Sequence, residues 1–108
     1  MRVRGGQIVW VDLDPTRGHE QRGHRPALVI AAAAMRSTTI VVPLTSSPPK
    51  APSHHRMAGE RMSVALCEQV RAIDTERVTG VLGAAELADL DRVRKIVAML
   101  IGVQATRH

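Results

Sequence analysis

The spacing of apolar residues changes once along this chain, close to Ala84, and the change limits the folds that it can adopt. From Leu87 to Ile101 apolar residues recur at intervals of three and four over about four turns, which predicts an amphipathic helix. Before this point they alternate with polar residues or form short β-branched runs, as strands do. Short strands followed by one terminal helix indicate an α+β fold, a small β-barrel or curled sheet covered by the helix.

Prolines mark the boundaries of the predicted strands. Pro26 has no N–H and therefore belongs at the first position of a strand, whereas Pro43 predicts an edge or a bulge. In the first strand the alternation puts Val9, Val11 and Leu13 on one face. We expect strands over residues 7–14, 27–33 and 37–46, and one bent strand or a hairpin over residues 63–73.

The remaining segments carry turn signals. Residues 15–24 form a long loop flanked by glycine, and the proline-rich residues 47–61 predict an exposed, mobile loop. Asp74 is expected to cap a short helical turn. The glycine-bounded residues 79–83 predict a last short strand.

Length and charge restrict the class of protein. A chain of 108 residues is expected to form one domain, spanning residues 1–108. Residues 1–61 hold nine Lys or Arg against four Asp or Glu, while residues 62–108 hold six of each, so the excess positive charge lies in the first part. A polyanionic partner fits this charge, as does a basic surface without a specific partner. No apolar run is long enough for a membrane span or a signal peptide, and we expect a cytoplasmic protein.

Two polar residues are candidates for phosphate chemistry. Arg25 is held at a strand start by Pro26, and Thr45 would lie at the same rim if the second and third strands are antiparallel neighbours. The alternatives are ordinary: Arg25 would pair with an acid such as Asp12, Asp14 or Glu20 to close the loop, and Thr45 would act only as a β-former.

Other polar residues allow weaker interpretations. Ser63 and Gln69 are donors suited to bases or phosphate, or ordinary surface residues. The neighbours His54 and His55 invite an acid–base interpretation, but a solvated loop tip is favoured. The histidines and the single Cys67 have no recognised ligand spacing, so no metal site or cofactor is expected. Trp10 is the only aromatic residue, which argues against a base-stacking platform.

Three stretches in order, GGQIVWVDLDPTRGHEQRGHRPALVI, IVVPLTS and SVALCEQVRAIDTERV, resemble the MazF/PemK family of toxin endoribonucleases. The resemblance implies a small SH3-like β-barrel of the CcdB-like superfamily, usually a homodimer. It implies metal-independent cleavage of single-stranded RNA at short motifs. The ribose 2′-hydroxyl attacks the adjacent phosphorus and leaves 2′,3′-cyclic phosphate and 5′-hydroxyl ends. An acidic, MazE-like antitoxin is the implied inhibitor.

The family's functional positions carry over onto this chain residue by residue. Arg25 and Thr45 match catalytic positions, with Glu20 nearby. An arginine keeps its proton at neutral pH, so we expect Arg25 to act mainly as a clamp on the transition state. The implied RNA-binding residues are Gln21, His24, His54, His55, Ser63, Gln69 and Arg71.

Two departures from the family concern the RNA-binding region. Met62 replaces a common acidic residue, and the segment between Thr45 and Ser63 is short. One alternative is a non-catalytic SH3-like toxin relative that acts by binding a protein, as a topoisomerase or gyrase inhibitor does. Another is a general basic RNA-binding module, against which the shortage of aromatic residues argues.

Overall fold

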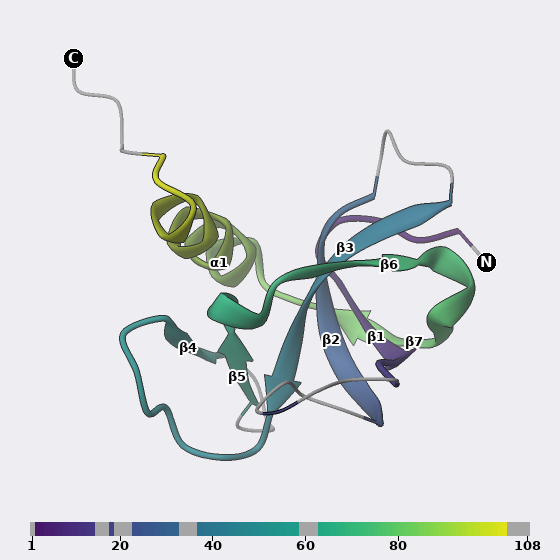
Figure 1. Ribbon diagram of the computed structural model, residues 1–108, viewed down its shortest axis with the longest axis horizontal. Helices are drawn as coiled ribbons and strands as arrows, with labels where there is room; N and C mark the ends of the chain where they lie inside the picture. Colours follow the sequence, from purple (N-terminus) through teal and green to yellow (C-terminus); the bar gives the residue numbers. More distant parts are fainter. Residues whose placement is uncertain (1, 15–17, 19–22, 33–36, 59–62, 104–108) are drawn as a thin grey trace.

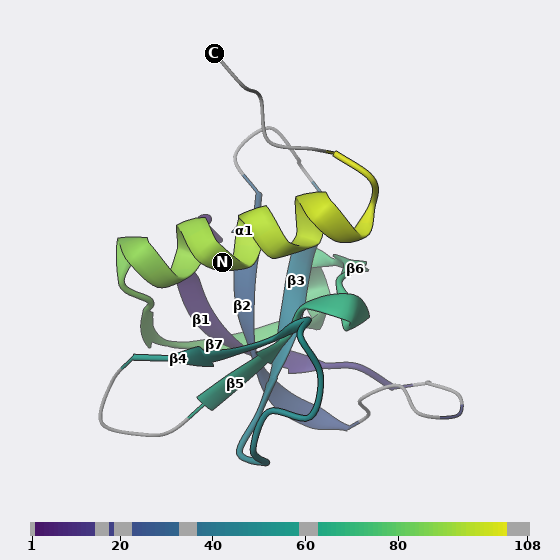
Figure 2. The same cartoon turned by 90° about the vertical axis from the view of Figure 1, so that its left-hand side faces the viewer.

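The structure, a computed structural model, describes residues 2–14, 18, 23–32, 37–58 and 63–103. Strands β1 to β7 form one antiparallel sheet in the order β4-β5-β3-β2-β1-β7, and β6 pairs with β3 beside this path. A single long helix, α1, follows the strands and lies across one side of the sheet (Figures 1 and 2). The elements are β1 Gln7–Asp12, β2 His24–Ala31, β3 Thr38–Thr45, β4 His54–Met57, β5 Ser63–Leu66, η1 Cys67–Gln69, β6 Arg71–Asp74, η2 Thr75–Arg77, β7 Val78–Ala84 and α1 Leu87–Leu100.

The expected α+β class, an antiparallel sheet with a C-terminal helix, is confirmed. The pairings among the described residues give a bent, open sheet whose ordered path ends at β4 and β7. The segment expected as one bent strand or a hairpin is divided by η1 into β5 and β6. Both of these strands pair with β3, at different positions along it.

Strand β3 has a different neighbour at each of its ends. Its first half, Thr38 to Val41, pairs with β6, and Leu44 and Thr45 pair with β5. Pro43 lies between these two pairings and is fully buried. The expectation of an edge strand or a bulge at this proline is therefore wrong: the missing N–H is tolerated because one neighbour leaves β3 there and the other joins.

The apolar side chains form two layers, one on each face of the sheet. The inner core, on the face away from α1, contains Val9, Val11 and Leu13, which are fully buried as their alternation predicted. The helix-side core lies between the other face and α1 and takes Leu90 and Val93 from the helix. Burying one such side chain contributes roughly 1.5–3 kcal/mol, so this second layer holds α1 on the sheet.

Two local expectations have different outcomes. Asp74 accepts a hydrogen bond from the backbone N–H of Glu76 at 2.9 Å and caps η2, as expected. The expected mobile loop over residues 47–61 is wrong in part, because β4 forms within it and pairs with β5. Periodicity could not reveal a four-residue strand that is stabilised by its neighbour.

No helix among the described residues is long and apolar enough to cross a membrane.

Candidate nucleic-acid interface

Arg25 and Thr45 come together at one end of the sheet, where β2 begins and β3 ends. The two strands are antiparallel neighbours, and their last recorded pair at this end is Ala27 with Pro43. Continuing this register by two residues would set Arg25 opposite Thr45. Directly opposed residues share a face, with side chains about 5 Å apart, so the strand alignment favours Arg25 and Thr45 as cross-strand neighbours.

Both side chains are half-buried, which suits groups that must be held in place and still reach a ligand. Arg25 is also paired with Val11 of β1, whose side chain belongs to the inner core. The Oγ1 atom of Thr45 accepts a hydrogen bond from the backbone N–H of Ser47 at 3.2 Å. Since a hydroxyl both accepts and donates, Thr45 can still donate to a phosphate oxygen.

A second arginine lies in line with this pair. Thr45 pairs with Val64 of β5, and Val64 pairs with Arg56 of β4. Thr45, Val64 and Arg56 therefore form one row across three strands, and continuing the β2–β3 register adds Arg25 on a fourth; we call these four residues the arginine row. Three strand spacings separate its two arginines, roughly 14 Å along the sheet. By strand alternation, both arginines are expected on the face that carries Thr45.

Two further arginines support the end of β1 beside this row. Arg71 is paired with Val41 and donates from Nη1 to the backbone oxygen of Leu13 at 3.4 Å. Arg77 donates from Nη1 to the backbone oxygens of Asp12 and Asp14. Arg71, implied as an RNA-binding residue, therefore already supports the backbone of its own chain.

The base of the loop between β1 and β2 is closed by one side-chain contact and one backbone contact. Asp14 accepts from the N–H of Gly23 through Oδ1 at 2.9 Å, and Leu13 donates to the oxygen of Gly23 at 3.0 Å. The implied site residues Glu20 and Gln21 belong to this loop and lie outside the described residues, as does Met62. Their roles stay predictions.

His24 points to the helix side of the sheet, because it is next to Arg25 on the same strand. Its Nε2 atom lies 2.5 Å from Oγ1 of Thr79, and its ring lies 5.4 Å from the Trp10 ring, centroid to centroid. The structure therefore separates His24 from the Arg25–Thr45 pair, on the opposite face.

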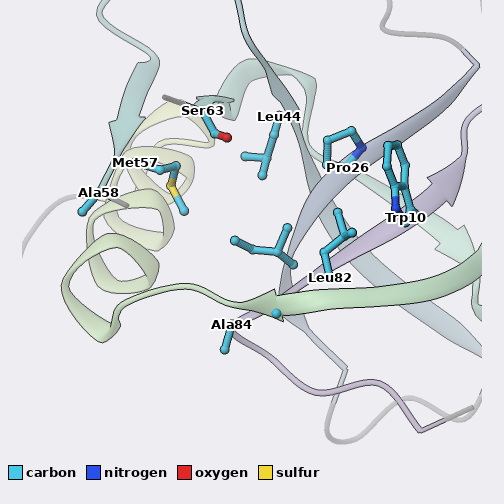
Figure 3. A pocket seen from close by; sticks show the side chains of 10 residues that line it. Trp10, Pro26, Leu44, Met57, Ala58, Ser63, Leu82 and Ala84 are labelled. Carbon is cyan, nitrogen blue, oxygen red and sulfur yellow. The ribbon is translucent and has the colours of Figure 1, made fainter. Parts of the chain in front are cut away.

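An apolar cleft of about 690 Å³ lies on this second face (Figure 3). Ser63 extends its hydroxyl into the cleft and is the one side chain in its lining that carries a hydroxyl. Ser63 and Thr45 thus lie at the same end of the sheet but on different faces, since Thr45 is opposite Val64. The lining residues are Ile8, Trp10, Pro26, Leu44, Met57, Ala58, Ser63, Leu82, Gly83 and Ala84.

His54 and His55 are held on β4 and are not a solvated tip. Because side chains alternate along a strand, the two rings lie on opposite faces of the sheet. They therefore cannot act together as an acid–base pair. Nε2 of His54 lies 3.0 Å from Oε2 of Glu68, while Nε2 of His55 lies 2.9 Å from Oδ1 of Asp89 on α1. The side chains of His54 and His55 are 11% and 23% exposed. Their implied RNA contacts remain predictions, and each ring already binds a carboxylate.

Cys67 is buried beside this site and is unsuited to act as a nucleophile. Burial, reinforced by the neighbouring Glu68 carboxylate, raises the pKa of the Cys67 thiol to about 11. A thiol with this pKa is almost fully protonated at neutral pH.

Gln69 lies half-buried in the same short helix, η1. Within the described residues no three His, Cys, Asp or Glu side chains come together in a group that could hold a metal ion.

Sequence reasoning missed Arg56, Glu68 and Asp89. Arg56 belongs to a segment that was expected to be a loop. In the structure it pairs with Val64, which in turn pairs with Thr45. Glu68 and Asp89 find their histidine partners 14 and 34 residues away, which no local pattern reveals.

Comparison with known proteins gives a consistent result. Residues 4–101 match the family described as PemK-like, MazF-like toxin of type II toxin-antitoxin system. The chain is 36% identical over 103 residues to endoribonuclease toxin MazF of Escherichia coli K12, covering 90% of this chain and 92% of the relative. It is 37% identical over 111 residues to endoribonuclease MazF9 of Mycobacterium tuberculosis, covering 87% and 94%.

Solved structures with the same fold include toxins of this type. MazF of Deinococcus radiodurans superimposes with a TM-score of 0.82 and 31% identity, covering 91% of this chain and 94% of that one. A MazE-MazF structure from the same organism gives a TM-score of 0.77 with 25% identity, covering 93% and 95%.

Proposed function

Because the chain belongs to the PemK-like, MazF-like toxin family of type II toxin-antitoxin systems, we propose that it is an endoribonuclease toxin whose reaction centre contains Arg25 and Thr45. The observation that supports this proposal is the antiparallel pairing of β2 and β3, whose last recorded pair, Ala27 with Pro43, is two residues from both donors. A protein that only bound a partner would not need a guanidinium and a hydroxyl at one rigid point.

The substrate is single-stranded RNA, and the chemistry is an internal transfer at phosphorus. The ribose 2′-hydroxyl attacks the adjacent phosphorus, the bond to the 5′-oxygen of the next nucleotide breaks, and the products carry 2′,3′-cyclic phosphate and 5′-hydroxyl ends. The protein must stabilise the extra negative charge on the phosphorane. Arg25 and Thr45 do so as donors fixed in advance by the sheet.

Glu20 is proposed as the acid–base partner, because an arginine holds its proton too firmly to give it up and take it back at neutral pH. The remaining implied contacts, Gln21, His24, His54, His55, Ser63, Gln69 and Arg71, are proposed to bind RNA directly or to hold the groups that do. Residues 1–108 are proposed to act as one toxin domain in the cytoplasm, where RNA substrates are available.

The proposed protein partner is an acidic antitoxin of the MazE type. One structural relative is a MazE-MazF complex, and the arginine row offers positive charge to an acidic segment. We also propose a homodimer, because the end of α1 exposes apolar side chains: Met99 is 61% and Ile101 is 70% exposed.

One experiment tests the catalytic proposal. Purified protein is incubated with a long single-stranded RNA in excess EDTA, and the products are separated on a denaturing gel. Discrete fragments that polynucleotide kinase labels without prior phosphatase treatment carry 5′-hydroxyl ends and support the proposal. Intact RNA at high protein concentration overturns it and favours a toxin relative that acts by binding a protein.

A further inference from the structure

The segment between β3 and β4, residues 46–53, starts directly after Thr45 and is tied down at several points. We call it the 46–53 loop. At its start, the backbone N–H of Ser47 donates to Oγ1 of Thr45 at 3.2 Å. At its end, the N–H of His54 donates to the oxygen of Ala51 at 3.0 Å. The course of this loop is therefore coupled to the position of the Thr45 hydroxyl.

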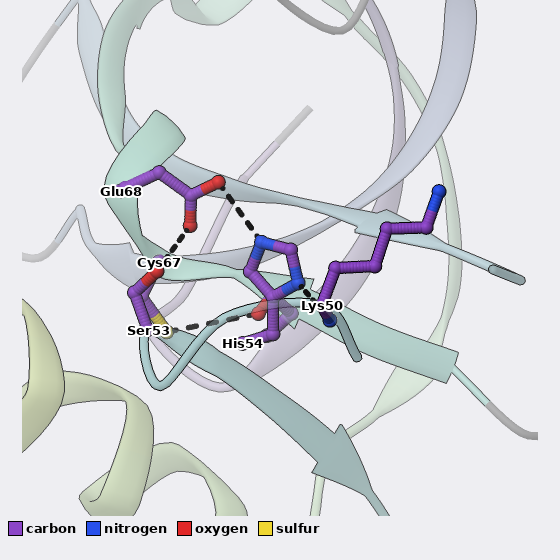
Figure 4. A network of polar contacts seen from close by, with 6 residues as sticks. Lys50, Ser53, His54, Cys67 and Glu68 are labelled. Carbon is purple, nitrogen blue, oxygen red and sulfur yellow. Dashed lines mark hydrogen bonds and ion pairs between the residues drawn. The ribbon is translucent and has the colours of Figure 1, made fainter. Parts of the chain in front are cut away.

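His54 forms a bridge between this loop and η1 (Figure 4). The backbone N–H of Lys50 donates to Nδ1 of His54 at 3.0 Å. A backbone N–H can only donate, so Nδ1 carries no proton in this contact, and Nε2 carries it instead. Nε2 then donates to Oε2 of Glu68 at 3.0 Å.

Glu68 completes the network from the other side. Its Oε1 atom accepts a hydrogen bond from Oγ of Ser53 at 2.8 Å, and the N–H of Cys67 donates to the oxygen of Ser53 at 3.3 Å. Burial alone would raise the pKa of the Glu68 carboxyl, but hydrogen bonds from Ser53, the backbone and His54 outweigh it and lower the pKa. Glu68 is therefore an ionised acceptor for both the loop and the histidine at neutral pH.

The side chains of His54 and Glu68 differ in exposure, and only that of His54 is largely buried. The side chain of His54 is only 11% exposed, and that of Glu68 is 39% exposed. Lys50, Ser46 and Ser47, by contrast, are exposed on the loop. The loop thus presents exposed groups to a ligand, while the His54 ring that holds the loop is largely buried.

We propose that His54 and Glu68 are positioning residues that fix the 46–53 loop beside Thr45 and thereby determine which nucleotides are accepted next to the cleaved phosphate. This inference rests on the proposed ribonuclease function and assigns His54 an indirect role in place of a direct RNA contact. A loop held in one conformation fits a narrow set of bases, whereas a released loop adapts to several. Its release also displaces the Thr45 hydroxyl, to which Ser47 is bonded.

Two substitutions at one position separate this role from a general structural one. Glu68→Ala removes both acceptors, so Ser53 and His54 lose their partner. Glu68→Gln keeps the bridge: the amide oxygen accepts from Nε2 of His54, and the amide N–H donates to the Ser53 hydroxyl, which can reverse its role. Ser53→Ala is a milder variant that removes only the loop-side bond.

The readouts are the cut-site pattern on one long RNA, mapped by sequencing fragment ends, and kcat and KM for the preferred motif and its single-base variants. Glu68→Ala is expected to lower kcat/KM for the preferred motif by roughly 10- to 100-fold. Discrimination against the single-base variants should fall by about tenfold. Ser53→Ala should shift both quantities in the same direction by less, and Glu68→Gln should restore the wild-type pattern.

The outcomes distinguish this proposal from the proposed function. Wild-type protein that cleaves no RNA overturns the ribonuclease function. If the wild type cleaves while a folded Glu68→Ala or Ser53→Ala protein keeps the same cut sites and discrimination, the positioning role is overturned. Hydrogen exchange of the Lys50 amide, measured without RNA, checks the bridge itself: exchange should be slow in the wild type and in Glu68→Gln, and fast in Glu68→Ala.

Discussion

His55 of β4 and Asp89 of α1 are joined by a contact of 2.9 Å between Nε2 and Oδ1, which ties the edge of the sheet to the helix. The second carboxylate oxygen of Asp89 accepts from the backbone N–H of Ala58 at 2.8 Å. Asp89 is buried, so both bonds are partly shielded from water. The polar connection therefore supplements the apolar packing that holds α1 on the sheet.

Asp89→Ala is expected to lower the free energy of unfolding by about 2–4 kcal/mol, because it leaves His55 and the Ala58 N–H without an acceptor. Urea unfolding followed by the fluorescence of Trp10 measures the change. Asp91→Ala is the matched control, since the Asp91–Lys95 ion pair is exposed and should contribute about 0.5 kcal/mol or less. Equal effects of the two substitutions would contradict this account.

Arg25→Lys is expected to lower kcat by about 10²- to 10³-fold with little change in the unfolding midpoint, because the ammonium keeps the charge but loses the planar fork. Thr45→Val, which keeps the shape and removes the hydroxyl, should also lower kcat. Single-turnover cleavage of one short RNA measures both. Near-normal cleavage by Arg25→Lys would show that the geometry of the guanidinium is not required.

Arg56→Ala is expected to raise KM while leaving kcat nearly unchanged, since Arg56 lies at the far end of the arginine row from Arg25. The dependence of log KM on log salt should lose about one unit of slope, as expected for the loss of one phosphate contact. Arg92→Ala, an exposed arginine on α1, is the control and should leave both quantities unchanged. A fall in kcat alone for Arg56→Ala would place this residue at the reacting phosphate instead.

Cys67 is expected to resist alkylation in the folded protein until the solution is strongly alkaline. Its pKa is raised from 9.0 to about 11, so the folded state keeps the thiol protonated while the unfolded state ionises. Stability linked to this group is therefore present below pH 9 and lost as the pH rises through about 11. Iodoacetamide labelling from pH 7 to 11, with and without urea, measures this, and rapid labelling of the folded protein at pH 8 would contradict it.

Some of the site follows from local chemistry that a sequence displays. The alternation in residues 7–14 placed Val9, Val11 and Leu13 in one layer, and the first position of a strand was assigned to Pro26 because it has no N–H. The structure extends that strand back to His24, so it contains Arg25. The prediction that Arg25 and Thr45 lie at the same rim required the further assumption that the second and third strands are antiparallel neighbours. The pairing of β2 with β3 confirms this assumption.

The sequence by itself determined the α+β class, the C-terminal helix and the buried face of the first strand, because hydrophobic periodicity and proline geometry act over a few residues. Only the tertiary structure decided the rest. In the folded protein β3 pairs with β6 before Pro43 and with β5 after it, and β4 forms inside a proline-rich segment. His54 contacts Glu68, and His55 contacts Asp89. Cross-strand pairs and buried ion pairs form between residues distant in sequence, so their energies depend on the packed sheet and leave no local pattern.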